Sequence, residues 1–315
     1  MENYWKDVGK NNRNVNSDAS NYETKIKELS ENGNISGNSL IDVVFDKTDL
    51  SMCIKQLSNG KACGIDQIPN EFLKYGGDAI VDSLLALFTK VKILETLPNE
   101  WKNGLLRPLH KRSDDENLDN YRGITINSNV YKVFTSLIEH RVSSFCEENN
   151  IFGDLQGAFR KQRRLENHIF ALKGLCSIRK AKKHKTWLGF IDITKAFDVI
   201  DRNQLFVKLW ETGIQGKLWR LLRETYHGVQ NKVFFGNISS EWFENDTGLK
   251  QGCCLSPTTF SIIMTDLITA LNDAKLGIPF NDETVPALLF ADDIVLMAES
   301  EDQLNQMLGI FIVLD

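Results

Sequence analysis

Cysteine pairs of the metal-binding kind and long apolar runs are missing from this sequence. Its six cysteines show no C-x-x-C spacing of a zinc site; they are Cys53, Cys63, Cys146, Cys176, Cys253 and Cys254. The adjacent pair among them is unsuited to an ordinary disulfide, so we expect reduced thiols in an intracellular protein. We find no apolar run long enough to span a bilayer and expect no signal peptide. The five histidines are scattered, without the spacing of a metal or nucleophile site.

Positive charge is also scarce. The 37 Lys and Arg residues are outnumbered by 42 Asp and Glu residues, which gives a net charge of −5. This balance argues against nucleic-acid binding by the molecule as a whole. A binding channel needs only local positive charge, however, and two basic runs stand out at residues 160–164 and 179–185. Either run could be a solvated face, and we favour that interpretation for the second.

The composition is that of a globular protein. The chain has 315 residues, of which 42% are hydrophobic and 10% aromatic, enough for one large domain or two small ones. Residues 1–39 are polar and poor in large apolar side chains, so we expect a flexible segment there with one helix near residues 22–29.

Two adjacent aspartates interrupt an apolar run near the end of the chain. The run, Leu288–Leu296, reads L-L-F-A-D-D-I-V-L. Burial of an unpaired carboxylate costs several kcal/mol, so Asp292 and Asp293 are expected at the turn of a tight hairpin. Its strands would be residues 287–290 and 294–297. Taken alone, the pair could be an ordinary Asp-rich turn.

A third carboxylate follows another apolar run. Residues 186–191 (T-W-L-G-F-I) are typical of a strand, and Asp192 ends it. A strand ending at Asp192 beside the hairpin would bring three carboxylates together. Three carboxylates around two Mg²⁺ ions, roughly 3.5–4 Å apart, form the two-metal arrangement of phosphoryl transfer. The sequence therefore predicts catalytic and metal-binding roles for Asp192, Asp292 and Asp293.

Six segments, in order, resemble motifs of reverse transcriptases. They are G-K-A-C-G-I-D-Q-I-P-N-E (Gly60–Glu71), N-Y-R-G-I (Asn120–Ile124), Q-G-A-F-R (Gln156–Arg160), F-I-D-I-T-K-A-F-D (Phe190–Asp198), G-L-K-Q-G-C-C-L-S-P (Gly248–Pro257) and F-A-D-D (Phe290–Asp293). The best match is the enzyme of non-LTR retrotransposons of the jockey-like LINE kind. One motif alone is weak, but six in order are strong. Five positions depart from the family pattern, none of them a metal ligand: Cys63, Gly123, Ala158, Gln162 and Arg164.

The resemblance implies an α+β fold of the right-hand polymerase type. Fingers and palm would be present, the palm being a small antiparallel sheet backed by helices, and the thumb would be missing. The implied activity is RNA-directed DNA synthesis, which extends a primer 3′-OH with dNTPs on an RNA template. Two Mg²⁺ ions would serve as cofactors, and Mn²⁺ could replace them. The partners would be RNA template and DNA primer, with no membrane, in the nucleus or a cytoplasmic ribonucleoprotein.

The same resemblance assigns roles to further residues. The nucleotide-binding set is Lys111, Arg122, Phe197, Gln251 and Gly252, and the nucleic-acid-binding set is Arg160, Lys161 and Arg163. Arg and Lys side chains suit phosphate oxygens. Phe197 would lie under the incoming sugar and exclude a 2′-hydroxyl, the group that distinguishes RNA from DNA. We assign three other carboxylates to local structure instead of metal binding: Asp66 to a loop, Asp198 to a hydrogen bond and Asp201 to a helix cap.

We expect three regions along the chain. Residues 1–49 would be a flexible linker, 50–98 an N-terminal extension of the fingers, and 99–315 the reverse transcriptase domain, truncated before the thumb. Such a chain would show weak or no processive synthesis. Two alternatives stay open: an RNA-dependent RNA polymerase, against which Ala291 and Phe197 speak, and a non-catalytic retroelement relic that at most binds nucleic acid.

Periodicity predicts the remaining elements. Helices are expected near residues 78–98, 130–145, 169–176, 202–210, 256–271 and 300–312, with Asp201 and Ser256 as caps of two of them. Short strands are expected at 105–109 and 124–126, and a hairpin of 232–235 with 241–243 would turn at Gly236-Asn237.

Overall fold

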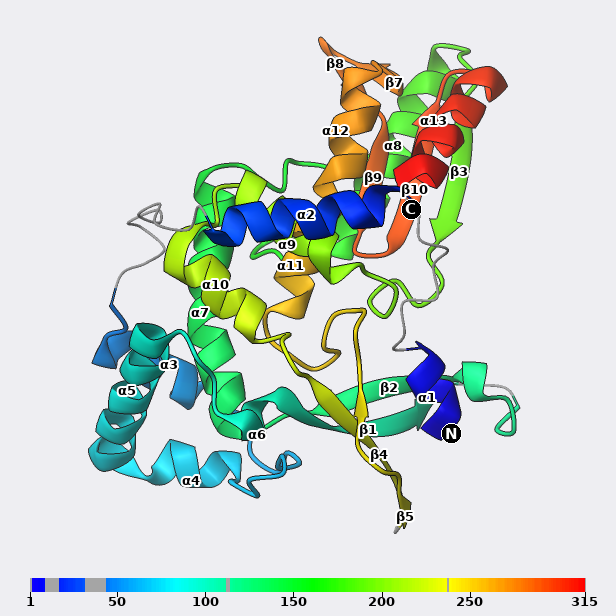
Figure 1. Ribbon diagram of the computed structural model, residues 1–315. Coiled ribbons are helices and arrows are strands. Elements are labelled where there is room, and N and C mark those ends of the chain that lie inside the picture. The colour runs from blue at the N-terminus through cyan, green and yellow to red at the C-terminus, as the bar shows by residue number, and fades with distance from the viewer. Residues whose placement is uncertain (1, 9–16, 32–43, 112–113, 237, 315) are drawn as a thin grey trace. The chain divides into compact units, whose positions relative to one another are not determined.

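The computed structural model describes residues 2–8, 17–31, 44–111, 114–236 and 238–314 (Figure 1). Within these ranges the chain forms two compact units, each made of two separate stretches. The first unit comprises residues 1–145 and 197–256, and the second comprises residues 146–196 and 257–315. The division does not follow the expected borders at residues 49 and 98, because each unit is assembled from segments distant in the sequence.

The first unit contains three of the six helices that the periodicity predicts. Its helices are α1 (Glu2–Val8), α2 (Ser17–Glu31), α3 (Lys47–Lys55), α4 (Asn70–Tyr75), α5 (Gly77–Leu94), α6 (Asn99–Lys102), the 3-10 helix η1 (Leu118–Asn120), α7 (Asn129–Glu148, whose last residues belong to the second unit), α9 (Arg202–Glu211) and α10 (Gly216–Glu224). Asp201 caps α9 as expected, since its carboxylate accepts hydrogen bonds from the backbone N–H groups of Asn203 and Gln204.

A five-stranded mixed sheet lies in the same unit. Its strands are β1 (Asn103–His110), β2 (Tyr121–Ile126), β4 (Gln230–Phe235), β5 (Ile238–Ser239) and β6 (Phe243–Glu244). Strand β1 pairs antiparallel with β2 and parallel with β4. The predicted hairpin is present, with Phe235 opposite Ile238, although Asn237 lies outside the described residues. Its return strand is split, because β5 and β6 pair separately with β4.

One face of this sheet is covered by the N-terminal helix α1. Trp5 is 5% exposed and packs with Leu106, Val233 and Phe243. On α2, Ile26 is buried and Lys25 pairs with Glu211 of α9 at 2.5 Å. These contacts correct the expectation of a flexible linker for the described parts of residues 1–49. The helix expected near residues 22–29 is α2, whereas α1 was not expected from the composition of its polar segment.

An aromatic cluster forms the core between α5, α6 and α7. The ring centroids of Phe88 and Trp101 each lie 5.2 Å from that of Phe134, and Phe45 lies 6.0 Å from the same ring. Edge-to-face and tilted contacts at these distances add to the free energy of apolar burial. The cluster holds α7 in place at the start of the segment that leads to the second unit.

The second unit is built on a small antiparallel sheet. Its strands are β3 (Trp187–Asp192), β7 (Ile278–Phe280), β8 (Glu283–Val285), β9 (Ala287–Phe290) and β10 (Asp293–Ala298), and its helices are α8 (Leu165–Ala181), α11 (Ser256–Ile263, whose first residue belongs to the first unit), α12 (Thr265–Asp273) and α13 (Glu301–Leu314). The strand order β3-β10-β9 places β10 at the centre, and β7 pairs with β8 as a separate ribbon (Figure 1).

Helices cover both faces of the three-stranded sheet. On one face, Val295 and Met297 of β10 pack against Leu175 of α8. On the other, Gly189 of β3 lies opposite Leu296, and a Cβ built on this glycine would lie 3.0 Å from Leu304 of α13. Side chains alternate along a strand, so α8 and α13 lie on opposite faces. The mixed helices and small sheets confirm the α+β class.

The helix predicted over residues 256–271 is interrupted. The structure has α11 and α12 in its place, separated at Met264. The hydroxyl of Thr265 donates to the carbonyl oxygen of Ile262 at 2.7 Å, and that of Thr269 donates to Thr265 at 2.9 Å. Such back-bonding by threonine bends helices. Ser256 is the first helical residue, and its hydroxyl donates to the carbonyl oxygen of Lys250.

None of the helices in the described ranges is both long and apolar enough to cross a bilayer.

Candidate active site

The two adjacent aspartates lie at the predicted hairpin. Phe290 of β9 pairs with Asp293 of β10, which leaves Ala291 and Asp292 as the two turn residues. Ala291 has a φ of +58°, a conformation that costs a residue with a Cβ about 1–2 kcal/mol. Asp293 is the first residue of β10 and does not belong to the turn. The strand was expected to begin at residue 294, one residue later.

The third carboxylate meets the hairpin across the strand pair. Asp192 is the last residue of β3, and its direct partner in the register is Asp293. Directly paired residues point to the same face, so these two carboxylates stand side by side on the face that α8 covers. Both are exposed, while Asp292 is half-buried. The sequence thus anticipated the convergence of the two segments, and the register selects Asp293 as the partner of Asp192.

A complete three-ligand metal site is not formed. Among the described residues, no group of three or more His, Cys, Asp or Glu side chains is arranged to hold a metal ion. Neighbouring carboxylates repel one another when no cation lies between them. Coordination of a metal ion by all three aspartates stays a prediction. The donor set nevertheless suits a hard divalent cation, because carboxylate oxygens are the ligands that Mg²⁺ prefers.

An apolar groove lies next to the carboxylate pair. Its volume is about 370 Å³, and its lining includes Asp192, Asp293 and Phe190 from the sheet and Leu165 and Ile169 from α8. Phe190 is 74% exposed although it lies on a short strand. The two carboxylates therefore border an open apolar surface.

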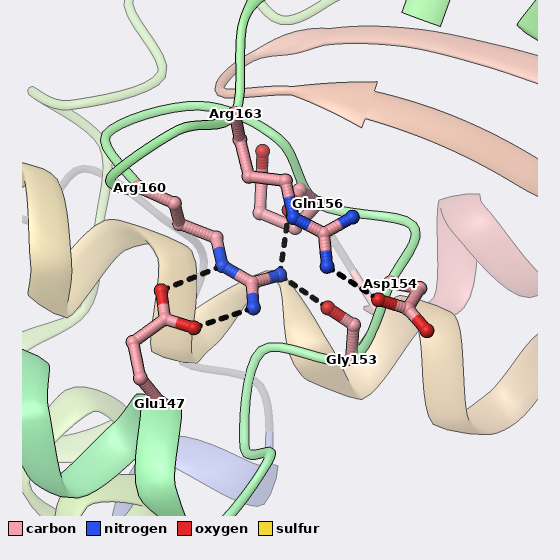
Figure 2. A network of polar contacts seen from close by, with 6 residues as sticks. All are labelled: Glu147, Gly153, Asp154, Gln156, Arg160 and Arg163. Carbon is pink, nitrogen blue, oxygen red and sulfur yellow. Dashed lines mark hydrogen bonds and ion pairs between the residues drawn. The ribbon is translucent and has the colours of Figure 1, made fainter. Parts of the chain in front are cut away.

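The loop that precedes α8 is held by a buried arginine. Arg160 is 9% exposed and forms two hydrogen bonds to the carboxylate of Glu147, at 2.8 and 2.7 Å. It also donates to the carbonyl oxygens of Gly153 and Gln156 (Figure 2). These hydrogen bonds are the main cause that lowers the pKa of Glu147. The predicted template contact is therefore corrected for Arg160, whose guanidinium is occupied by groups of its own unit.

Two other basic residues of this run, both in the predicted nucleic-acid-binding set, are accessible. Lys161 is exposed, and Arg163 pairs with the exposed carboxylate of Asp154 at 2.5 Å (Figure 2). A pair between exposed side chains contributes little free energy and is readily exchanged. Both residues remain candidates for contact with phosphate.

In the first unit, the predicted nucleotide-binding glutamine is held by an aspartate. Gln251 donates from Nε2 to Oδ1 of Asp198 at 2.6 Å, as the local role predicted for Asp198 requires. The backbone N–H of Leu249 donates to the carbonyl oxygen of Phe197 at 2.7 Å. These bonds join the segment after Asp192 to the loop of residues 248–252. Phe197 itself is half-buried.

The same loop is joined to β2. The N–H of Thr125 donates to the carbonyl oxygen of Gln251 at 2.8 Å. Gly252 has a φ of +109°, and a Cβ built there would lie only 2.5 Å from the carbonyl oxygen of Thr125. Glycine is required at this position by both the conformation and the close approach. Asp66, as predicted, orders its own loop, by bonds to Ile68 and Ser128.

Basic side chains line the exposed face of β1 and β2. Arg122 lies opposite Leu109, and Arg107 lies opposite Ile124. All four are exposed, while the neighbouring pairs that include Leu106 and Pro108 are buried. Lys111, also exposed, continues the alternation of Arg107 and Leu109 just beyond β1. The two predicted phosphate-binding residues therefore share a face with an arginine that the sequence interpretation did not select.

A buried lysine lies next to Gln251. Lys250 is 6% exposed, and its Nζ is 5.0 Å from the ring centre of Tyr131 and 6.0 Å from that of Tyr226. Burial lowers its pKa to about 7. Lys250 and Gln251 line a cavity of about 30 Å³, together with Asp198 and Arg202. Sequence reasoning did not single out this lysine, because a motif does not report burial.

Two further residues near the hairpin were not selected from the sequence. Gln156 is completely buried, and its side-chain oxygen accepts a hydrogen bond from the N–H of Ala291 at 3.1 Å. His168 places Nε2 at 2.9 Å from the carbonyl oxygen of Leu289 and packs edge-on against Phe290. Gln156 begins one of the six motifs, but its partner 135 residues away is visible only in the fold.

Comparison with known proteins supports the resemblance. Residues 109–313 match the family described as reverse transcriptase (RNA-dependent DNA polymerase). The chain is similar to the probable RNA-directed DNA polymerase from transposon BS of Drosophila melanogaster, with 26% identity over 260 residues, 78% of this chain and 27% of that protein. For the corresponding protein of the X-element, also from Drosophila melanogaster, identity is 26% over 71% of this chain and 25% of that protein.

A third relative is the RNA-directed DNA polymerase from mobile element jockey of Drosophila melanogaster. It is 22% identical over 273 residues, which are 83% of this chain and 28% of that protein. The chain spans about a quarter of the length of these three relatives. The family match covers more than half of the chain, and it includes β2, the loop before α8 and the aspartate hairpin. This chain belongs to the reverse transcriptase (RNA-dependent DNA polymerase) family.

Proposed function

We propose that this chain carries the catalytic region of an RNA-directed DNA polymerase of a non-LTR retrotransposon. It would extend a primer 3′-OH with dNTPs on an RNA template. The observation that carries the proposal is the register that sets Asp192 opposite Asp293 at the end of a three-stranded sheet, inside the region that matches the family. In this proposal the second unit provides palm elements, and the β1–β2 strands of the first unit belong to the fingers.

Asp192, Asp292 and Asp293 would hold divalent cations. The chemistry that bound Mg²⁺ would supply there is a lower pKa of an attacking hydroxyl and compensation of charge on the triphosphate. Two of these carboxylates share one face and are exposed, as direct metal contact requires. The half-buried Asp292 would complete the set from the turn.

The nucleotide would be bound by groups of the first unit. Arg122 and Lys111 would contact triphosphate oxygens from the exposed face of the β1–β2 pair. Gln251, held by Asp198, would contact the nucleotide or the template, and Gly252 would keep the loop close to β2. Lys161 and Arg163 would contact the template backbone, and Arg160 is left out of this set because it is buried.

Primer extension on matched RNA and DNA templates tests the activity. The unsubstituted chain is expected to add dNTPs on RNA, and Asp192→Asn or Asp293→Asn should lower the rate by more than about 100-fold, the upper end of the effect expected for an outer-shell partner of a metal. Asp282→Asn is the matched control, because Asp282 is an exposed carboxylate in the turn between β7 and β8. Circular dichroism establishes that each variant is folded. A folded chain that binds primer–template but adds no nucleotide would indicate the non-catalytic alternative.

Sugar selection provides a separate prediction. Phe197→Val removes the proposed wall beneath C2′, so incorporation of ribonucleotides relative to deoxynucleotides should rise. The ratio is measured by single-nucleotide addition with competing rNTP and dNTP. If the ratio is unchanged while activity is retained, Phe197 serves only in packing.

A further inference from the structure

The loop of residues 155–158 is attached to the aspartate hairpin as an extra strand-like segment. The N–H of Leu289 donates to the carbonyl oxygen of Leu155, and the N–H of Gly157 donates to that of Leu289, both at 2.9 Å. Gln156 and Leu289 thus form a parallel bridge. A Cβ on Gly157 would lie 2.8 Å from Nε2 of His168, so a larger residue there would require this imidazole to shift.

The side chain of Gln156 extends this attachment to the turn. Its oxygen accepts hydrogen bonds from two backbone N–H groups, that of Ala158 at 3.0 Å and that of Ala291 at 3.1 Å. The side chain is completely buried, and Nε2 has no hydrogen-bond partner among the described residues. The contact therefore depends on the oxygen as an acceptor, and the amino group is not used.

Ala291, whose N–H donates to Gln156, has a strained backbone conformation. Ala291 has a φ of +58°, and it immediately precedes Asp292. A residue in such a conformation persists only where its surroundings hold it. The side-chain oxygen of Gln156 accepts a hydrogen bond from the N–H of this residue, one position before a proposed metal ligand.

Gln156 is fixed in turn by the arginine of its own motif. Arg160 donates to the carbonyl oxygen of Gln156 at 3.0 Å and is anchored on Glu147 at the end of α7 (Figure 2). A continuous series of contacts runs from α7 through Arg160 and Gln156 to the turn that carries Asp292. The motif Q-G-A-F-R thereby has a structural role that does not involve the template.

We propose that Gln156 is a positioning residue that holds the Ala291-Asp292 turn in the geometry for binding the catalytic cation. The functional half of this proposal rests on the proposed polymerase activity and on cation binding by Asp192, Asp292 and Asp293. Its structural half, the hold on the turn, does not depend on that activity.

Three variants test the proposal. Gln156→Met has a similar shape but no acceptor for the two N–H groups. Gln156→Glu, compared at about pH 5, where burial keeps the carboxyl protonated and uncharged, retains an oxygen acceptor and replaces only the unused amino group. Gln306→Met is the matched control, because Gln306 is exposed on α13. Thermal unfolding establishes that each protein is folded.

Hydrogen exchange of the Ala291 amide measures the hold on the turn. Gln156→Met should accelerate this exchange about 10-fold more than it accelerates exchange of β3 amides. Gln156→Glu and Gln306→Met should leave the exchange rate of the Ala291 amide near that of the unsubstituted protein. Equal exchange at Ala291 in Gln156→Met and the unsubstituted chain would overturn the proposal. Faster exchange of the Ala291 amide in Gln156→Glu than in the unsubstituted chain would overturn the acceptor role of the Gln156 oxygen.

Binding of Mn²⁺, followed by electron paramagnetic resonance without primer, template or dNTP, measures the functional half. Gln156→Met should weaken binding by about 10-fold, an effect typical of outer-shell residues, and nucleotide addition should show a lower kcat with little change in KM for primer–template. Unchanged Mn²⁺ affinity in Gln156→Met, or no Mn²⁺ binding by the unsubstituted chain, would refute this half. Mn²⁺ binding that depends on Gln156 in a chain without nucleotide addition would refute only the polymerase activity.

Discussion

Arg160 and Arg163 lie three residues apart and have different surroundings. The side chain of Arg160 is 5% exposed and bound to Glu147 and two carbonyl oxygens, whereas Arg163 and its partner Asp154 are 37% and 80% exposed. Removal of a buried partner leaves polar groups unsatisfied. Arg160→Ala should therefore lower the free energy of unfolding by about 2–4 kcal/mol, and Arg163→Ala by less than about 1 kcal/mol, as measured by urea unfolding at neutral pH.

The Arg160–Glu147 pair also has a defined pH response. The folded-state pKa of Glu147 is lowered from 4.5. The contribution of Glu147 to the free energy of unfolding is therefore complete above pH 4.5 and is lost as the pH falls through the lowered pKa. The difference between Arg160→Ala and the unsubstituted chain should thus shrink in acid. Equal costs for the two arginine substitutions would contradict the structural role assigned to Arg160.

Lys250 also makes stability rise with pH, but in a window above pH 7. Burial lowers its pKa to about 7 in the folded chain, so the unfolded chain binds more protons between pH 7 and its ordinary pKa of 10.5. The free energy of unfolding of the unsubstituted chain should therefore rise as the pH rises from 7 towards 10.5. Lys250→Met should stabilise the protein at pH 7, and its advantage should shrink by up to about 2 kcal/mol between pH 7 and pH 9.

Urea unfolding of both proteins at the two pH values measures this difference. Tyr131, Tyr226, Cys253 and Arg202 surround the ammonium group, and they are the same in both proteins. A difference independent of pH would show that Lys250 remains charged in the folded state.

At the scale of elements, the attachment of the loop of residues 248–252 to β2 depends on glycine. Gly252→Ala would place a Cβ 2.5 Å from the carbonyl oxygen of Thr125 at a φ of +109°. Gly228→Ala is the matched control, with a φ of +64° and nothing within 4 Å of the added Cβ. We expect a cost of about 1 kcal/mol for the control, from conformation alone, and about 3 kcal/mol or more for Gly252→Ala.

Chemical denaturation of the two glycine variants gives both costs. Equal costs would mean that the loop can move away from β2, and the attachment would then not constrain Gln251. A larger cost for Gly252→Ala would support a loop that is held against β2 before any nucleotide binds.

For the whole molecule, a net charge of −5 requires that nucleic acid be bound by local positive charge. The logarithm of the binding constant falls with that of the salt concentration, with a slope of about −0.7 to −0.9 for each phosphate neutralised. Lys161→Ala should reduce the magnitude of this slope by about 0.7–0.9 if Lys161 contacts the template. Lys182→Ala, in the second basic run, should leave the slope unchanged.

Fluorescence anisotropy with a labelled RNA–DNA duplex, measured at several salt concentrations, provides these slopes. If Lys182→Ala had the larger effect, the template would contact the second basic run and the first would be the solvated face.

The sequence by itself determined the class of the molecule and the centre of the candidate site. The order of six motifs predicted the family, and an apolar run broken by Asp292 and Asp293 predicted the hairpin, because charged groups cannot stay in a buried strand. The same local pattern predicted the bounds of β9, and those of β3 and β10 to within one residue at each end. Local patterns suffice there because strand alternation and turns depend on residues close together in the chain.

Only the tertiary structure decided which side chains meet. It set Asp293 opposite Asp192, buried Arg160 against Glu147, brought Gln156 to Ala291 and made α1 and α2 part of the fold. Each of these outcomes depends on pairing register, burial or a partner far along the chain. A motif specifies residue types and spacing, whereas solvent access and long-range contacts depend on how the whole chain packs, and these determine whether an arginine binds a phosphate or supports a loop.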